Sequence, residues 1–388
     1  MVKKRLANFM NFIIITSLSF LCSCKEIQDS IFHIKGYDDA IYQNGENIKI
    51  KNFDAIALDV PDSIYIGTIR QIGFSDSLIV VLGYNMIYTF NYQGAYCGHI
   101  GNIGHGHGEY IQPKTFCINN KQNIIEVIDT YANSILQFDL NGKFLSSKKV
   151  KQDISAIYQY EYLPDGKILG CNYIFKKPSD VYFIGDADFA NITHKLSSNL
   201  ISSAMMPVGS HPFTVRDQTI KMCLPFSNII YEYVYGEIKP FMQIDSKLKV
   251  FDEKEIKNIN FMQPVNMSTV PSKQDIFWGF SDLFETDKFI ILNTPYDSYF
   301  IIEKGKLMGK RYSNYSFEQM VYTHLPLIKL NSVKGDTLVG IDNAKSLKNR
   351  VILDSLSQDH NMIKFRNFIN SLPDKDIPVL LMYQIESI

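Results

Sequence analysis

The densest group of side chains able to do chemistry lies in residues 98–113, where glycine alternates with histidine. Imidazole nitrogens serve as metal ligands or exchange protons near neutral pH, and here they come from His99, His105 and His107. The alternative is a loop that crosses between two structural units, with glycines that supply positive φ and close backbone approach. We take the following as candidate ligand-binding residues, the last two of which could instead cap and pack the loop: His105, His107, Glu109 and Tyr110.

Nucleophile and nucleotide-binding motifs are missing from the sequence. Gly73-Phe74-Ser75 and Gly279-Phe280-Ser281 begin like a nucleophile elbow, but each lacks the closing glycine and a following helix pattern. Neither a GxxxxGK nor a GxGxxG sequence occurs. We therefore predict no catalytic residue, no metal and no cofactor, and we favour a role that is not enzymatic.

The N-terminus reads as a secretory signal. Three basic residues precede an apolar run at 13–21, and Cys22-Ser23-Cys24 follows. The apolar run is shorter than the roughly 20 residues that a bilayer core requires. An ordinary cleaved signal is one interpretation, but Leu21-Cys22-Ser23-Cys24 resembles a bacterial lipobox in which Cys22 replaces the usual small residue. We predict a signal peptide over 1–23 and lipidation of Cys24. Because Lys25 rather than Asp follows the modified cysteine, the resemblance to known lipoprotein sorting rules implies the outer membrane, on either face.

The charge and the cysteine content of the chain restrict the kinds of partner and ligand that it can bind. The chain has a net charge of −1, and loss of three cations with the signal changes it to −4, spread evenly. Such a surface does not indicate nucleic acid. Four further cysteines, at 97, 117, 171 and 223, have wide spacings without a CxxC pair, so a metal site is not indicated. Their strand-like surroundings favour small buried hydrophobes, although an exported protein can form disulfides.

The elements that would position these residues are short strands in a repeat. The segments 86–96 and 134–144 alternate apolar and polar residues around turn glycines 48 residues apart, Gly94 and Gly142. Asn141-Gly142 predicts a hairpin with a type I′ turn, in which both central residues have positive φ. Weaker copies occur at 181–189, 229–238 and 299–307, and an apolar run precedes each hairpin. Units of about four strands and 40 to 50 residues are typical of propeller blades.

Six such blades account for the chain. The sixth combines 337–341 with 377–385, and the strand at 53–60 supplies its missing edge, which closes the ring. Short helices are expected near 249–262 and 359–372. The sequence thus predicts an all-β, six-bladed β-propeller over 51–388, with residues 24–50 as a tether to the lipid.

The sequence from Gly98 to Pro113, with Asn141-Gly142-Lys143-Phe144, resembles six-bladed β-propeller lipoproteins of gut-type gram-negative anaerobes. Their architecture is that of NHL and TolB-like propellers, and most are of unknown function. Members typically carry Gly-Pro-Gly-Glu-Tyr after the first blade, where this chain has His107 at the proline position. The first strands, such as Ala55-Ile56-Ala57-Leu58, and the last, 377–383, are also similar. The resemblance implies a fold and a location but no reaction.

Three roles remain open from the sequence. We expect an envelope-anchored binding or protein-interaction module, with the membrane and an envelope protein or glycan as partners and no nucleic acid. The alternative is a metal-dependent hydrolase or lyase of the lactonase or NHL-lyase kind, which would need inward-facing His, Asp or Glu residues from several blades. A structural role in a larger envelope complex is the third.

Overall fold

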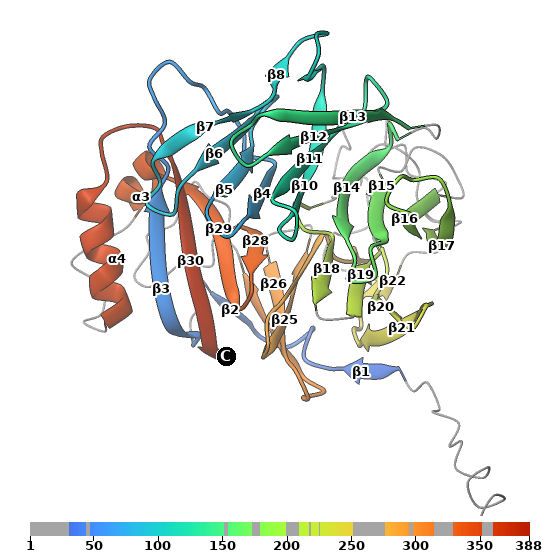
Figure 1. Ribbon diagram of the computed structural model, residues 1–388. Coiled ribbons are helices and arrows are strands. Elements are labelled where there is room, and N and C mark those ends of the chain that lie inside the picture. Colours follow the sequence, from blue (N-terminus) through green and yellow to red (C-terminus); the bar gives the residue numbers. More distant parts are fainter. Residues whose placement is uncertain are drawn as a thin grey trace, which may run out of the picture. The chain divides into compact units, whose positions relative to one another are not determined.

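The computed structural model describes residues 31–43, 47–150, 154–172, 179–198, 209–216, 219–224, 226–250, 276–294, 298–313, 329–350 and 360–388. Residues His33–Ile388 form one unit. That unit is the predicted six-bladed β-propeller, in which six antiparallel sheets follow one another in chain order (Figure 1). No helix among the described residues is long and apolar enough to cross a membrane.

The first three blades have four strands each. Blade 1 consists of β4 (Gln71–Phe74), β5 (Ile79–Leu82), β6 (Ile87–Phe90) and β7 (Tyr96–Ile100). Blade 2 consists of β10 (Pro113–Asn119), β11 (Ile124–Asp129), β12 (Ser134–Asp139) and β13 (Phe144–Lys149). Blade 3 consists of β14 (Ile157–Tyr162), β15 (Ile168–Asn172), β16 (Ser179–Gly185) and β17 (Ile192–Ser198).

Blades 4 and 5 each gain a fifth strand from the N-terminal segment. Blade 4 consists of β18 (Phe213–Arg216), β19 (Thr219–Cys223), β20 (Ile229–Val234) and β21 (Glu237–Ile244), with β1 (Phe32–Ile34) added at its outer edge. Blade 5 consists of β24 (Asp282–Glu285), β25 (Phe289–Thr294), β26 (Ser298–Glu303) and β27 (Gly309–Ser313), with β2 (Ile41–Gln43) added in parallel.

Blade 6 joins the two ends of the chain, as the sequence predicted. It consists of β28 (Leu330–Lys334), β29 (Thr337–Asn343), β30 (Pro378–Ser387) and β3 (Lys49–Ala57). Antiparallel pairing places Phe53 opposite Tyr383 and Ala57 opposite Val379. Two further pairs are short and parallel: β8 (Asn102–Ile103) with β9 (Glu109–Tyr110), and β22 (Lys249–Val250) with β23 (Ile276–Phe277).

Alternation along each strand explains how the blades pack. In β5, Ile79 and Val81 belong to the apolar cluster shared with blade 6, whereas Val80 and Leu82 belong to the cluster shared with blade 2. Successive side chains of a strand point to opposite faces, so each sheet is apolar on both sides. Six such clusters of described residues each lie between two neighbouring blades. Ring closure therefore buries the two faces of every blade.

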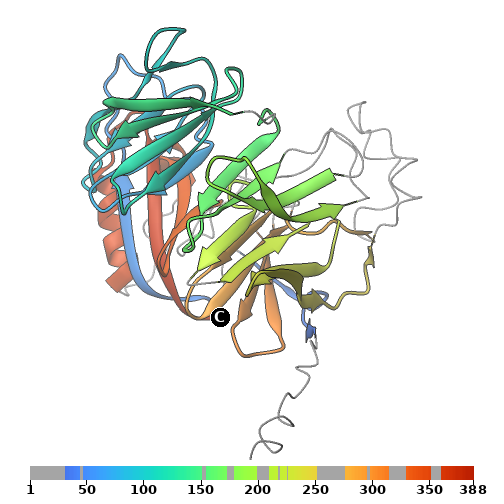
Figure 2. The ribbon, with the colours of Figure 1, turned by 45° about the vertical axis from the view of Figure 1, so that its right-hand side comes forward.

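Two helices pack on the outside of blade 6. Helix α3 (Ala344–Arg350) follows β29, and α4 (His360–Ser371) occupies the position predicted for a helix near the C-terminus. In Figures 1 and 2, α4 lies against β3. Met362, Phe365 and Ile369 face the core, and the ring of Phe365 meets Phe53 edge-on at 5.5 Å between centroids. The helix predicted at 249–262 lies outside the described residues, except for the two residues of β22.

The repeat glycines form hairpins, but the predicted type I′ turn is wrong. Gly94 and Gly142 have φ of 85° and 82°, and neither preceding residue has positive φ. Gly142 N donates to Asp139 O at 3.0 Å, and the Asp139 carboxylate accepts from the backbone N of Asn141 and Lys143, both at 2.9 Å. This side chain stabilises a longer loop, in which a turn ends in a left-handed glycine and a bulge.

The N-terminal segment 33–43, which we call the strap, runs along blades 4 and 5 and is blue in Figure 2. Ile34 and Tyr37 are buried in the cluster between these blades. Lys35 N donates to Leu307 O at 3.1 Å, and Gly309 N donates to Lys35 O at 2.9 Å. Part of the segment expected to serve as a tether, together with the start of β3, therefore belongs to the propeller.

Candidate functional site

The glycine-rich loop connects β7 of blade 1 to β10 of blade 2 and is held by its own side chains. The Glu109 carboxylate accepts from Gly106 N at 2.8 Å. Tyr110 is fully buried and donates to Ile100 O at 2.7 Å. Beyond it, Asp129 accepts from Ile111 N at 2.7 Å. Glu109 and Tyr110 thus cap and pack the loop.

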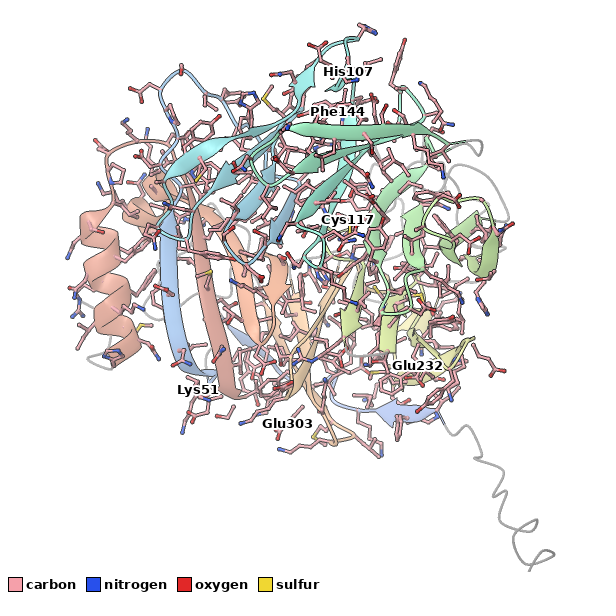
Figure 3. All side chains as sticks on the ribbon, viewed as in Figure 1. Lys51, His107, Cys117, Phe144, Glu232 and Glu303 are labelled. Carbon is pink, nitrogen blue, oxygen red and sulfur yellow. The ribbon has the colours of Figure 1, made fainter. Side chains whose placement is uncertain are left out.

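The histidines of the loop do not converge on one point. His99 Nε2 lies 3.0 Å from Asn102 Oδ1, whereas the His107 ring meets Phe144 edge-on at 4.7 Å between centroids. His105 is exposed. Figure 3 shows His107 beside Phe144 at the top of the view, away from Cys117 near the centre. Among the described residues no group of three His, Cys, Asp or Glu side chains could hold a metal ion.

A cavity of about 330 Å³ lies where the inner strands of the blades meet. Its wall comes from β4, β10, β14 and β28, and from Ser210 and His211 just before β18. This is the channel of the propeller, and the four strands and the segment before β18 belong to five different blades. Clefts built from several elements, with a few polar groups among apolar ones, are typical ligand sites.

Several polar atoms of this wall have no hydrogen-bond partner among the described residues. Five buried side-chain oxygens have no hydrogen-bond partner within the described part of the chain, and three of them line the cavity: Gln159 Oε1, Ser210 Oγ and Asn331 Oδ1. Asn331 is 5% exposed. Leaving a buried polar atom unpaired costs about 1–3 kcal/mol, so native proteins rarely keep one without water or a ligand beside it. Three in one cavity indicate a place that receives polar groups.

Glu161 is the carboxyl of the cavity wall. It lies on β14 between Tyr160 and Tyr162, and no other described residue forms a hydrogen bond or an ion pair with its carboxyl group. Burial raises the pKa of Glu161 to about 7, because desolvation disfavours the charged form. The protein therefore holds a carboxyl that exchanges its proton near neutral pH.

His211 is oriented by the backbone of blade 5. Its Nδ1 lies 2.9 Å from Leu283 O, so Nδ1 carries the proton and donates it to this carbonyl. The ring packs against Phe284 with centroids 4.9 Å apart. Burial lowers the pKa of His211, and the imidazole is therefore neutral at pH 7 with a lone pair on Nε2.

Two cationic side chains near the cavity, Lys334 and Arg216, interact with groups other than Glu161. Lys334 of β28 places its ammonium 3.8 Å from the centroid of Tyr92 and 5.5 Å from that of Phe74. Arg216, at the end of β18, pairs with Asp287 and Asp336 and so joins hairpins of blades 4, 5 and 6. Neither side chain neutralises Glu161.

The serines of the two elbow-like sequences have structural partners. Ser75 Oγ accepts from Leu78 N at 2.9 Å within the β4–β5 turn. Ser281 Oγ donates to Asp282 Oδ2 at 2.9 Å. Cys117, Cys171 and Cys223 are buried, as expected, and all are free thiols. The expectation of burial is wrong for Cys97, which lies on the exposed face of the outer strand β7. Cys24 lies outside the described residues.

The cavity residues were missed because they follow no local motif. Residues 158–162 read Tyr-Gln-Tyr-Glu-Tyr, which shows only that polar and aromatic side chains alternate in a strand. A carboxyl on an inner strand, between two aromatic residues, is the signal that could have identified Glu161. Ser210, His211 and Asn331 meet it only through ring closure.

Two solved structures show the same fold. The crystal structure of a "Putative exported protein" from Bacteroides fragilis NCTC 9343 is 20% identical, with a TM-score of 0.69, and the match covers 92% of this chain and all of that one. A member of the DUF4221 family from Bacteroides vulgatus ATCC 8482 is 9% identical, with a TM-score of 0.52, over 88% and 98% of the two chains.

Sequence comparison identifies the family without a function. None of the curated proteins matches the chain. The model of a domain of unknown function, DUF4934, matches residues 37–384, from the strap to the last strand of blade 6. Because this match spans nearly all of the propeller, the chain belongs to the DUF4934 family.

Proposed function

We propose that this protein is an exported, outer-membrane lipoprotein whose propeller binds a small polar molecule in its channel. The lipobox-like sequence ending in Cys24 supports the anchor. The Bacteroides fragilis protein of the same fold is named as exported, which agrees with a location outside the cytoplasm. The binding role rests on the channel rather than on this likeness, because one fold serves many functions.

One observation carries the binding role. Blades 3 and 6 and the segment before blade 4 bring Gln159, Asn331 and Ser210 to one cavity, each with a buried oxygen that lacks a partner. A site for a polar ligand is stabilised when the ligand supplies those partners. The cavity volume of about 330 Å³ lies at the lower end of ligand sites, which run from about 300 to 1,000 Å³. The ligand is therefore small.

Saturation-transfer NMR with defined panels tests this function. The panels contain monosaccharides, disaccharides, amino acids and aliphatic amines, and the protein is the mature chain. We expect at least one panel to receive saturation from the protein, and the binding to weaken at least tenfold in Gln159→Leu. Gln93→Leu, an exposed site in the β6–β7 turn, is the matched control. If no panel responds, or if both variants bind alike, the channel is not the binding site.

A further inference from the structure

The wall of the channel offers acceptors. The three unpartnered buried atoms are all oxygens, from Gln159, Ser210 and Asn331. Because Nδ1 of His211 donates to Leu283 O, the remaining nitrogen of that ring is also an acceptor. Glu161 adds a carboxyl group to the same wall. A ligand that matches such a wall carries several N–H or O–H donors.

The charges that line the cavity decide whether a cationic or a neutral donor fits it better. The titratable groups that line the cavity with Glu161 are the Cys117 thiol on β10, the phenols of Tyr160 and Tyr162, the His211 imidazole and, at the rim, Lys334. β4 contributes none. Two cations, Arg70 and Lys114, line a small adjoining cavity with Gln159 and Ser210. The Arg70 guanidinium donates to Gly83 O and Pro113 O. The thiol and the imidazole are neutral at pH 7, because burial raises the pKa of Cys117 and lowers that of His211.

Glu161 therefore has no counter-ion within the described part of the chain. Lys334 is held over Tyr92, with its ammonium 3.8 Å from the ring centroid. Behind the wall, the Glu126 carboxylate already accepts from Tyr162 Oη and Gln137 Nε2, both at 2.6 Å. A carboxylate removed from water is stabilised by a cation placed beside it, and a second anion would be repelled.

Aromatic side chains complete the match. Phe74, Phe116 and Tyr160 line the cavity with Glu161. An ammonium group is attracted to the face of an aromatic ring, as the rim shows with Lys334 over Tyr92 and Phe74. An ammonium carries three donors and no acceptor, which suits a wall of acceptors better than a hydroxyl group does.

We infer that the channel recognises the primary ammonium group of a small amine, with Glu161 as its counter-ion and Gln159, Ser210 and Asn331 as its hydrogen-bond acceptors. This inference rests on the proposed binding function and specifies its ligand class. The ammonium ion pairs with the ionised carboxylate. Binding therefore releases to solvent the proton of each Glu161 that was protonated, about half a proton per molecule at pH 7. Anionic molecules of the same size are excluded.

Three probes of one shape test the inference: n-butylamine, n-butanol and butyrate, titrated by NMR into the mature protein. We expect the amine to bind at least tenfold more tightly than the alcohol, and butyrate not to bind. Since the pKa of Glu161 is about 7, its ionised fraction, and with it the amine affinity, rises about tenfold from pH 6 to pH 8. The alcohol shows no such dependence.

Variants at position 161 provide the second arm. Glu161→Gln loses at least tenfold in amine affinity and its pH dependence, while Glu161→Asp retains both in part. Thermal melts establish that each variant is folded. Equal amine binding by wild type and Glu161→Gln would overturn the inference, as would equal affinity for amine and alcohol. If sugars from the panels bind and n-butylamine does not, this inference fails while the proposed binding function stands.

Discussion

Glu161 is a partly buried carboxyl whose ionisation opposes folding. Its pKa is about 7 in the folded protein, against an ordinary value near 4.5. Between these values the folded state holds the proton that the unfolded state releases. The stability of the protein therefore falls as pH rises from about 4.5 to 7, and the loss remains above pH 7.

Glu161→Gln should remove this loss. The melting temperature of the variant, relative to wild type, should rise from pH 4 to pH 8 by on the order of 2 °C and then level off. Scanning calorimetry across this range provides the measurement. Glu237→Gln, an exposed site at the start of β21, is the control and should show no such trend. A flat difference for Glu161→Gln would show that the carboxyl is ionised without penalty.

Single residues were the hardest level to predict from sequence. The loop histidines cluster within nine residues, a pattern that indicated a ligand or metal site. In the fold, however, His99 and His107 contact different partners. Glu109 and Tyr110 have the capping and packing role that was the alternative to binding. Asn331 and Gln159 are 172 positions apart in the chain, so no local pattern could join them.

At the scale of elements, the turn glycines of the repeat support more than a reversal of the chain. A Cβ on Gly94 would lie 2.1 Å from Ala57 O, at the end of the strand that closes blade 6. A Cβ on Gly142 would lie 2.4 Å from His99 O of blade 1. The hairpins of blades 1 and 2 therefore press these two glycines against the neighbouring blade.

Gly94→Ala and Gly236→Ala separate backbone strain from this close contact. Both glycines have positive φ, but nothing lies within 4 Å of a Cβ on Gly236. Gly236→Ala should cost about 1 kcal/mol of unfolding free energy from left-handed strain alone. Gly94→Ala should cost about 2 kcal/mol more, because the Cβ overlaps the Ala57 carbonyl. Urea denaturation measures both, and equal losses would show that the blade contact is not required.

Strands and their pairing were largely predictable, and the exceptions have physical causes. Hairpins such as β6–β7 and β12–β13 follow from alternation and a turn glycine. The turn type was wrong because side chains such as that of Asp139 stabilise a longer loop. The strap was expected as a tether that could carry a little strand of its own. Its place in the propeller could not be predicted, since its three-residue strands pair with residues more than 200 positions away.

At the scale of the whole molecule, anchoring is the prediction that remains to be tested. Cys24→Ser should abolish incorporation of radiolabelled palmitate in cells and shift the protein from the membrane to the soluble envelope fraction. The reason is that several acyl chains on one cysteine give stable attachment. Cys97→Ser, which changes an exposed cysteine of β7, is the matched control and should keep its label.

Labelling that persists in Cys24→Ser but disappears in a Cys22→Ser variant would move the anchor to Cys22. Absence of label in the wild type would leave an ordinary secreted protein. Neither result affects the channel, because the two features lie in separate parts of the chain.

Six blades and the closing strand were predictable because they repeat an apolar pattern that any ring of sheets requires. The last blade joins two segments near the ends of the sequence, β3 and β30. Their pairing runs from Lys49 opposite Ser387 to Ala57 opposite Val379. The channel chemistry does not repeat. It arises from a few polar residues that differ from blade to blade, such as Gln159 and Glu161 in blade 3 and Asn331 in blade 6.

The strap also has a mechanical consequence. Seven residues, 25–31, separate Cys24 from β1, which limits the span from a lipid on Cys24 to the propeller to about 30 Å. A pulling force applied through residues 25–31 acts on the strap first. It is resisted there by the hydrogen bonds of Lys35 with Leu307 and Gly309 and by the pairing of β2 with β27. The pairing of β3 with β30, which closes the ring, bears no load until the strap detaches. If Cys24 carries the proposed lipid, the membrane can pull on the protein without opening its ring.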